Sequence, residues 1–273
     1  MRSGTSVCAE IFHVWGAYGG EPHELTGPDE RNPHGYFEYK PLWDFLYDLG
    51  EFASGRSWWE ADFGERMATR ASDPPTAAKA RALIGRMEEP ARHWMWKDPA
   101  LCHFLRFWLQ FWHDPVFVLT VRHPVDIAVS WQQFCASAER GARTVEANLL
   151  SWQHMVLQVL RSTDDVKHRI FVEYEDLART PLAYAERLAS FLDDSLGVST
   201  PSLTVERMGA TCDPQLWRNR DGRRNGDHRM SVAQQALYDL QRTRVTEPSA
   251  PPGNYPMPLG WHTQVMAEEG REE

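Results

Sequence analysis

The 273-residue sequence has few lysines, no paired cysteines and no long apolar run. Its net charge of -9 at pH 7 argues against nucleic acid or an anionic membrane surface as a partner, because both are polyanions. The four cysteines form no CxxC pair and no metal-like spacing with histidine, so we expect a reduced, cytoplasmic protein without a bound metal. Since no apolar run has membrane length, we expect no membrane span.

Lysine supplies only four of the 29 basic residues, and we take the excess of arginine as a hint of a GC-rich bacterial genome. Hydrophobic residues make up 42% of the chain and include twelve tryptophans, which is ample for an apolar core. The length fits one large α/β domain, and no linker requires two. We expect one domain over residues 1–245 and a partly ordered acidic tail over 246–273.

The first six residues combine small, hydroxyl-bearing side chains with one arginine. Ser3-Gly4-Thr5-Ser6 runs directly into Val7–Trp15, whose apolar positions recur near the helical period. The first N–H groups of a helix lack an internal partner and carry the positive end of its dipole, so a glycine loop there makes an anion site. Arg2 adds a planar cation suited to phosphate. Taken alone, the segment equally fits a disordered terminus followed by a helix cap.

A second segment lies far downstream. Val116–Val121 is a continuous apolar, β-branched run, typical of a strand that is covered on both faces in a parallel sheet. Arg122 follows it, and Pro124 suits the first position of a helix over residues 125–134. Ser130 lies about 9 Å up that helix, so it and Arg122 can converge on one phosphate. Taken alone, Arg122 is explained equally well by an ion pair with a carboxylate. Taken alone, Ser130 is explained equally well as a side chain that faces solvent.

Together these segments resemble the sulfotransferases that use 3′-phosphoadenosine-5′-phosphosulfate (PAPS). Residues 2–6 resemble the family's 5′-phosphosulfate loop, and residues 122–131 resemble its 3′-phosphate motif. Trp96-Lys97-Asp98-Pro99 is similar to the Lys-Asp-Pro element of the tyrosylprotein and bacterial branches. Residues 172–177 are similar to the tyrosine-acidic-leucine segment that follows a late strand in the family. The four segments follow the family's order over about residues 1–195. The resemblance implies an α/β fold, a P-loop-like three-layer sandwich with a central parallel sheet flanked by helices.

The resemblance also implies the transfer of a sulfuryl group from PAPS to an acceptor hydroxyl of a small molecule, natural product, glycolipid or sugar. Glu38, just before a predicted helix over 42–49, is positioned to be the general base, as in bacterial relatives with a similar Gly-Tyr-aromatic-Glu segment. Its alternative role is to stabilise the helix N-terminus, and the rival bases are Glu21, Glu24 and His13.

By the same resemblance, Lys97 and Arg2 would neutralise charge on the leaving phosphate, and Tyr174 would contact the adenine. The alternative for Lys97 is an ion pair with Asp98. A basic loop over residues 213–230 would close over the nucleotide, and no metal is needed. The sequence leaves the oligomeric state open. Further helices are predicted over 76–87, 101–112, 144–161 and 182–192, and short strands over 93–96 and 169–172.

Two rival functions remain at this point. A P-loop kinase is disfavoured because the loop lacks the GxxxxGKS pattern and no strand-end aspartate suits magnesium. A catalytically impaired nucleotide-binding protein is the alternative without an enzyme activity. It arises because a phosphate-binding loop is normally fed by a central parallel strand, and no residue precedes Met1 to form one. We expect that Met1 is an internal residue taken as the start and that this first strand is missing upstream of it. The alternatives are that another segment fills the strand's place or that activity is impaired.

Overall fold

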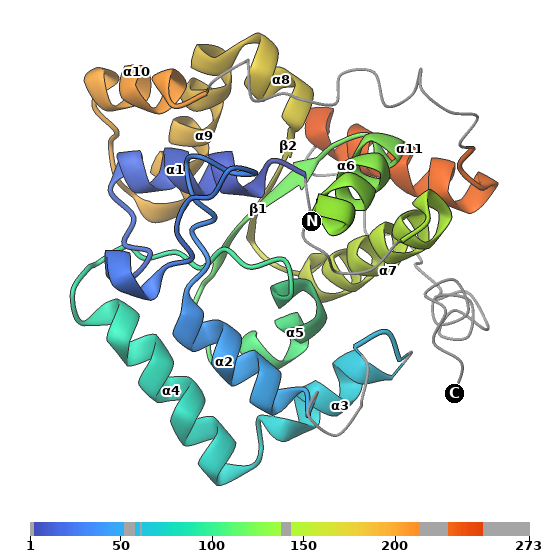
Figure 1. Cartoon of the computed structure of the whole chain (residues 1–273). Coiled ribbons are helices and arrows are strands. Elements are labelled where there is room, and N and C mark those ends of the chain that lie inside the picture. The colour runs from blue at the N-terminus through green and yellow to red at the C-terminus, as the bar shows by residue number, and fades with distance from the viewer. Residues whose placement is uncertain (1–2, 52–57, 61, 138–142, 213–228, 248–273) are drawn as a thin grey trace.

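The computed structural model describes residues 3–51, 58–60, 62–137, 143–212 and 229–247. Two parallel strands, β1 (Val116–Val121) and β2 (His168–Glu173), lie between helices (Figure 1). Their register sets Val116 opposite His168 and Val121 opposite Glu173. Because parallel strands need a long crossover, the chain passes between them through α6 (Pro124–Ser137) and α7 (Val145–Thr163).

The remaining helices cover the strands and extend the molecule on one side (Figure 1). They are α1 (Thr5–Trp15), the short 3-10 helix η1 (Pro22–Glu24), α2 (Lys40–Leu49), α3 (Phe63–Arg70), α4 (Pro74–Glu88), α5 (Leu101–Trp108), α8 (Tyr174–Arg179), α9 (Pro181–Leu196), α10 (Ser202–Ala210) and α11 (Val232–Thr246). Several start at recognisable caps. The Asp73 carboxylate accepts the Thr76 N–H at the start of α4, and Ser231 and Gln234 form a reciprocal capping box at the start of α11.

The parallel sheet flanked by helices confirms the coarse fold prediction. β1 has the predicted bounds, β2 extends the predicted strand by one residue at each end, and Pro124 is the first residue of α6. The strand predicted over residues 93–96 is wrong, because Trp94 forms only an isolated parallel bridge with Tyr18. A ladder needs a neighbouring strand along its length, and within the described residues this segment has none.

The core is divided among several apolar clusters. One cluster joins α2, α4 and α5 around Phe104, Phe107 and Trp108, which are fully buried. A second cluster packs α1 against α9 and β2. A third cluster joins α7 and α11 to both strands. The helical part formed by α2 to α5 therefore has its own apolar core, and the strands carry two others.

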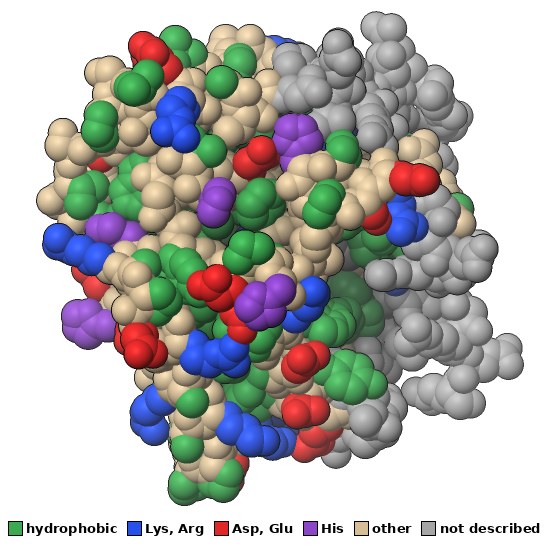
Figure 2. Space-filling model, turned by 60° about the vertical axis from the view of Figure 1, so that its left-hand side comes forward, with side chains coloured by type: hydrophobic (Ala, Val, Ile, Leu, Met, Phe, Trp, Pro, Cys, Tyr) green, Lys and Arg blue, Asp and Glu red, His purple; other side chains and the backbone are tan. Residues whose placement is uncertain are grey.

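The described surface carries side chains of both charges. On the face in Figure 2, acidic and basic side chains are interspersed. None of the described helices has both the length and the apolar character needed to cross a membrane.

Two histidines are buried where α5 packs on α7. The rings of His103 and His154 stack with centroids 5.2 Å apart, and Trp59 lies edge-on against both. Burial lowers the pKa of His103 well below its usual value and lowers the pKa of His154 to about 3, because an imidazolium loses its hydration there. Both side chains are therefore neutral in the folded protein at pH 7.

We expect these histidines to make the fold sensitive to acid. The unfolded chain binds protons from pH 6.5 downward while the folded chain does not, so the free energy of unfolding should fall by about 1.4 kcal/mol per pH unit for each histidine. His154→Phe keeps an aromatic ring in contact with Trp59 and should remove one of the two contributions. Chemical denaturation between pH 6.5 and 4.5 measures this. An exposed control, His23→Gln, should match the wild type, and an unchanged slope in His154→Phe would contradict the assignment.

Candidate functional site

The loop ahead of α1 is anchored at the carboxyl end of β1. Gly4 is the N-cap of α1 and has a left-handed backbone with φ of 93°. Ser3 is buried, and its Oγ accepts a hydrogen bond from Thr120 Oγ1 at 2.9 Å. The first turn of α1 holds no acidic residue that would neutralise the positive end of the helix dipole. The predicted anion-binding loop is thus held beside the end of β1. The positive end of the α1 dipole is not neutralised by an acidic residue in the first turn.

Tyr174, the first residue of α8, packs directly on Gly4. A methyl group at position 4 would overlap the Tyr174 ring, and the positive φ independently favours glycine. On the same ring, the Arg122 guanidinium carbon lies 4.6 Å from the centroid, a cation–π contact. The structure therefore brings together Gly4, Tyr174 and Arg122, which come from three distant parts of the sequence.

Arg122 and Ser130 are both buried, with 6% and 4% of their surface exposed. Arg122 follows β1 directly and Ser130 lies on α6, as predicted. Burial raises the pKa of Glu175, and the Arg122 charge acts in the opposite direction, so this carboxyl is one of the acidic neighbours of the arginine. The sequence analysis did not single out Glu175, although this residue lies in the tyrosine-acidic-leucine segment over residues 172–177.

Lys97 and Glu38 form an ion pair although 59 positions separate them. Lys97 Nζ lies 2.7 Å from Glu38 Oε1, and the side chains are 11% and 25% exposed. The ion-pair partner of Lys97 is thus Glu38 and not Asp98, the alternative that the sequence left open. Glu38 precedes Tyr39, the N-cap of α2, so it lies outside the first helical turn. Its observed contact is the lysine.

The three rival bases have other surroundings. Glu21 accepts a hydrogen bond from the Tyr18 hydroxyl at 3.1 Å and caps η1. Glu24 is ion-paired with Arg86 of α4. His13 is exposed on α1, with its ring against Phe37. Of the four candidate bases, Glu38 is the one whose carboxylate touches Lys97.

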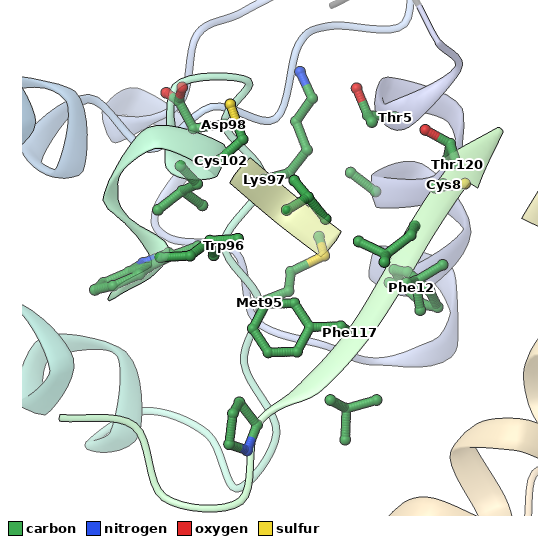
Figure 3. A pocket seen from close by; sticks show the side chains of 18 of the residues that line it. Thr5, Cys8, Phe12, Met95, Trp96, Lys97, Asp98, Cys102, Phe117 and Thr120 are labelled. Carbon is green, nitrogen blue, oxygen red and sulfur yellow. The ribbon is translucent and has the colours of Figure 1, made fainter. Parts of the chain in front are cut away.

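Lys97 extends to the polar end of a cavity of about 520 Å³ (Figure 3). Ser3, Thr5, Thr120 and Asp98 line the same cavity, and Figure 3 shows the Lys97 side chain reaching toward the end that holds Thr5. Burial, with the nearby Glu38 charge, raises the pKa of Asp98 to about 6, while its hydrogen bond from the Ala100 N–H acts against the rise. This end of the cavity therefore combines Lys97, Asp98 and the N-terminus of α1, and Glu38 contacts it through its ion pair with Lys97.

Some predicted residues lie outside the described part of the chain. These are Arg2, residues 213–228 of the basic loop and residues 248–273 of the tail. Within the described residues, no group of three or more His, Cys, Asp or Glu side chains is arranged to hold a metal ion.

A family model described as "Sulfotransferase family" matches residues 2–196, which include the loop before α1, Lys97, Arg122 and Tyr174. The chain belongs to the sulfotransferase family. No curated protein and no solved structure matched it. In this sulfotransferase the matched region ends with α9, so α10 and α11 lie beyond it. Membership supports sulfuryl transfer in general.

The pKa of Asp98 leads to a prediction about the stability of the sulfotransferase. The folded protein holds a proton on Asp98 that the unfolded chain has released, so unfolding becomes easier as pH rises from about 4 to about 6. Asp98→Asn keeps an acceptor for the Ala100 N–H without the charge. At pH 7 it should raise the free energy of unfolding by up to about 3 kcal/mol relative to the wild type, with no gain at pH 4.

Denaturant unfolding at both pH values measures this difference. The matched control is Asp44→Asn on the exposed face of α2, which should leave the pH dependence unchanged. A gain for Asp98→Asn that is equal at pH 4 and pH 7 would show that the carboxyl is not destabilised by its burial.

Proposed function

We propose that this sulfotransferase transfers the sulfuryl group of PAPS to an acceptor hydroxyl. The observation that carries the proposal is the Lys97–Glu38 ion pair, because Lys97 also lines the cavity end formed by Ser3 and Thr5. A cation is needed where the donor's bridging oxygen gains charge, and a base is needed where the acceptor loses its proton. The pair supplies both groups within 2.7 Å of each other.

The two phosphate ends of the donor have separate binding groups. The first N–H groups of α1 and the hydroxyls of the loop suit the 5′-phosphosulfate, with Arg2 as an additional cation. Arg122 and Ser130 suit the 3′-phosphate. Tyr174 supports this arrangement, because its ring touches Gly4 on the first site and Arg122 on the second. In the donor, the ribose separates the 5′-phosphosulfate from the 3′-phosphate, as the Tyr174 ring separates the two proposed sites. The adenine would then lie near Tyr174.

The chemistry we propose is an in-line displacement at sulfur. The acceptor oxygen forms a bond to sulfur, its proton goes to Glu38, and the bond from sulfur to the 5′-phosphate oxygen breaks with its electron pair on that oxygen. Protonation of Glu38 removes the counter-charge of Lys97, which leaves the ammonium available to the phosphate oxygen that becomes negative. The products are a sulfate ester and 3′,5′-adenosine bisphosphate (PAP).

The acceptor we propose is a hydroxyl of a small molecule, natural product, glycolipid or sugar. Incubation with sulfur-labelled PAPS and extracts of the source organism, followed by mass spectrometry of the labelled products, would identify it. Binding of PAP without transfer to any acceptor would favour a catalytically impaired nucleotide-binding protein. ATP binding without PAP binding would favour a kinase.

Glu38→Gln should lower turnover by about 10² to 10⁴ while PAP affinity stays near that of the wild type, because a general base acts on the acceptor proton and not on the nucleotide. Lys97→Met should lower turnover and also weaken PAPS binding, because it removes a positive charge beside the donor. Steady-state kinetics with titration of PAP separates the two effects.

Glu21→Gln is the matched control for the base, since Glu21 is a rival that contacts Tyr18 instead of Lys97. It should retain nearly full turnover. If Glu21→Gln loses turnover and Glu38→Gln keeps more than about a tenth of it, the role of base does not belong to Glu38.

Arg122→Ala should weaken PAP binding by about 2 to 4 kcal/mol, the range for removing one partner of a buried charged pair. It should affect adenosine 5′-phosphosulfate, which lacks the 3′-phosphate, far less. The control is Arg187→Ala, because the Arg187 guanidinium donates to the backbone carbonyls of Phe171 and Val245 and should not distinguish the nucleotides. Calorimetric titration of both nucleotides measures the difference. Equal losses for the two would exclude Arg122 from the 3′-phosphate site.

A further inference from the structure

A buried acid without a partner lies beside the proposed 3′-phosphate site. Glu175, the second residue of α8, is 7% exposed. Within the described part of the chain, neither of its carboxyl oxygens has a hydrogen-bond partner in another residue. Buried polar groups are nearly always hydrogen-bonded, because an unsatisfied group has lost its hydration without compensation. This side chain therefore points to a partner that the chain itself does not supply.

The register of the strands places this acid next to Arg122. Val121, the last residue of β1, lies opposite Glu173, the last residue of β2. Neighbouring strands lie about 4.8 Å apart, so the residues that follow the two strand ends leave the sheet side by side. The Arg122 guanidinium carbon lies 4.6 Å from the centre of the ring of Tyr174, the residue before Glu175. Glu175 is therefore a neighbour of the cation that we propose for the 3′-phosphate.

Carboxyl groups outnumber the cations around this position. Besides Arg122, the main charges that act on Glu175 are those of Glu173 and Asp126. Asp126 lies in the first turn of α6 and is 2% exposed, and Glu173 is ion-paired with Arg242 of α11. The cluster thus holds two arginines and three carboxyls. If all three carboxyls were ionised, their charge would repel a phosphate dianion that enters the cluster.

The other charged groups nearby have different surroundings. Helix α9 packs on α8 around the apolar Leu177, and its Arg187 donates to two backbone carbonyls. Glu186 of α9 is exposed. His123, which follows Arg122, has its ring against Tyr238 of α11. The charge balance at the buried acid is therefore set mainly by the arginines and acids named above.

Glu175 is suited to be the neutral member of this cluster. Burial raises its pKa above the ordinary value, and the two neighbouring acids act in the same direction, whereas its own backbone N–H and Arg122 oppose the rise. A protonated carboxyl also has an O–H, which can donate a hydrogen bond to a phosphate oxygen. The loss of one negative charge and the gain of one hydrogen-bond donor both favour a bound phosphate.

We infer that Glu175 is a further binding residue for the sulfuryl donor, and that its protonated carboxyl donates a hydrogen bond to the 3′-phosphate beside Arg122 and Ser130. The inference rests on the proposed function, because it takes this phosphate as the ligand. The acid takes its proton from solvent when the nucleotide binds and returns it when PAP leaves. Because the ionised acid would repel the phosphate, the affinity for the 3′-phosphate should fall as pH rises.

The test compares PAP with adenosine 5′-monophosphate, which lacks the 3′-phosphate. The ratio of the two affinities cancels effects at the 5′ end, including that of Asp98. Calorimetric titration between pH 7 and 8.5 measures this ratio. Where binding must take up a proton, the wild-type ratio should fall by up to about tenfold per pH unit. Glu175→Gln keeps a hydrogen-bond donor without a charge, so its ratio should stay constant and should exceed that of the wild type at pH 8.5.

Glu173→Gln is the matched control, because it removes the same charge from a carboxyl that already has a partner in Arg242. It should keep the pH dependence of the wild type. Infrared spectra of the PAP complexes give a second readout, since the C=O band of a protonated carboxyl should be present in the wild type and missing from Glu175→Gln.

The outcomes separate this inference from the proposed function. A wild-type ratio that does not fall with pH would overturn the inference, and so would equal pH profiles for the wild type and Glu175→Gln. An equal effect of Glu175→Gln on both nucleotides would also overturn it. In each of these cases PAP still binds, and the proposed function stands. A wild type that binds no PAP at any pH would overturn both.

Discussion

The contact of the Tyr174 ring with Gly4 on one side and Arg122 on the other is the constraint on which the site depends. It fixes the N-terminus of α1 relative to the end of β1, and the hydrogen bond from Thr120 to Ser3 fixes it a second time. An anion site made of helix N–H groups works only if those groups point in a fixed direction. The two tethers meet this need without a metal ligand or a disulfide among the described residues.

Acidic groups surround Lys97, the cation at the polar end of the cavity. Glu38 and Asp98 both lie near the lysine, so without a ligand the acids outnumber this cation. The pKa of about 6 for Asp98 lets that carboxyl take up a proton at modest cost. A bound phosphosulfate would raise the pKa further, and protonation would then remove repulsion between Asp98 and the donor. With the proposed donor, proton uptake and donor binding would be coupled through this half-buried acid.

The sequence predicted those features that depend on local pattern. β1, the start of α6 at Pro124 and the apolar helices α2, α4 and α5 follow from periodicity and caps. The pairing of Lys97 with Glu38 could not be read from the sequence, because 59 positions separate the two and the contact exists only in the packed fold. The strand over 93–96 was predicted wrongly, since a strand requires a neighbour as well as a suitable sequence. The stacked His103 and His154 were missed for the same reason, as each looks unremarkable in its own helix.

The central claim is that one nucleotide joins the N-terminus of α1 to Arg122, and a crystal structure of the full chain with PAP tests it most directly. The account predicts that the 5′-phosphate accepts hydrogen bonds from the N–H groups of Thr5 and Ser6. It predicts the 3′-phosphate within hydrogen-bond distance of Arg122 and Ser130, with the Tyr174 ring between the two sites. A nucleotide whose 5′-phosphate lies away from α1, or whose 3′-phosphate lies away from Arg122, would contradict the account.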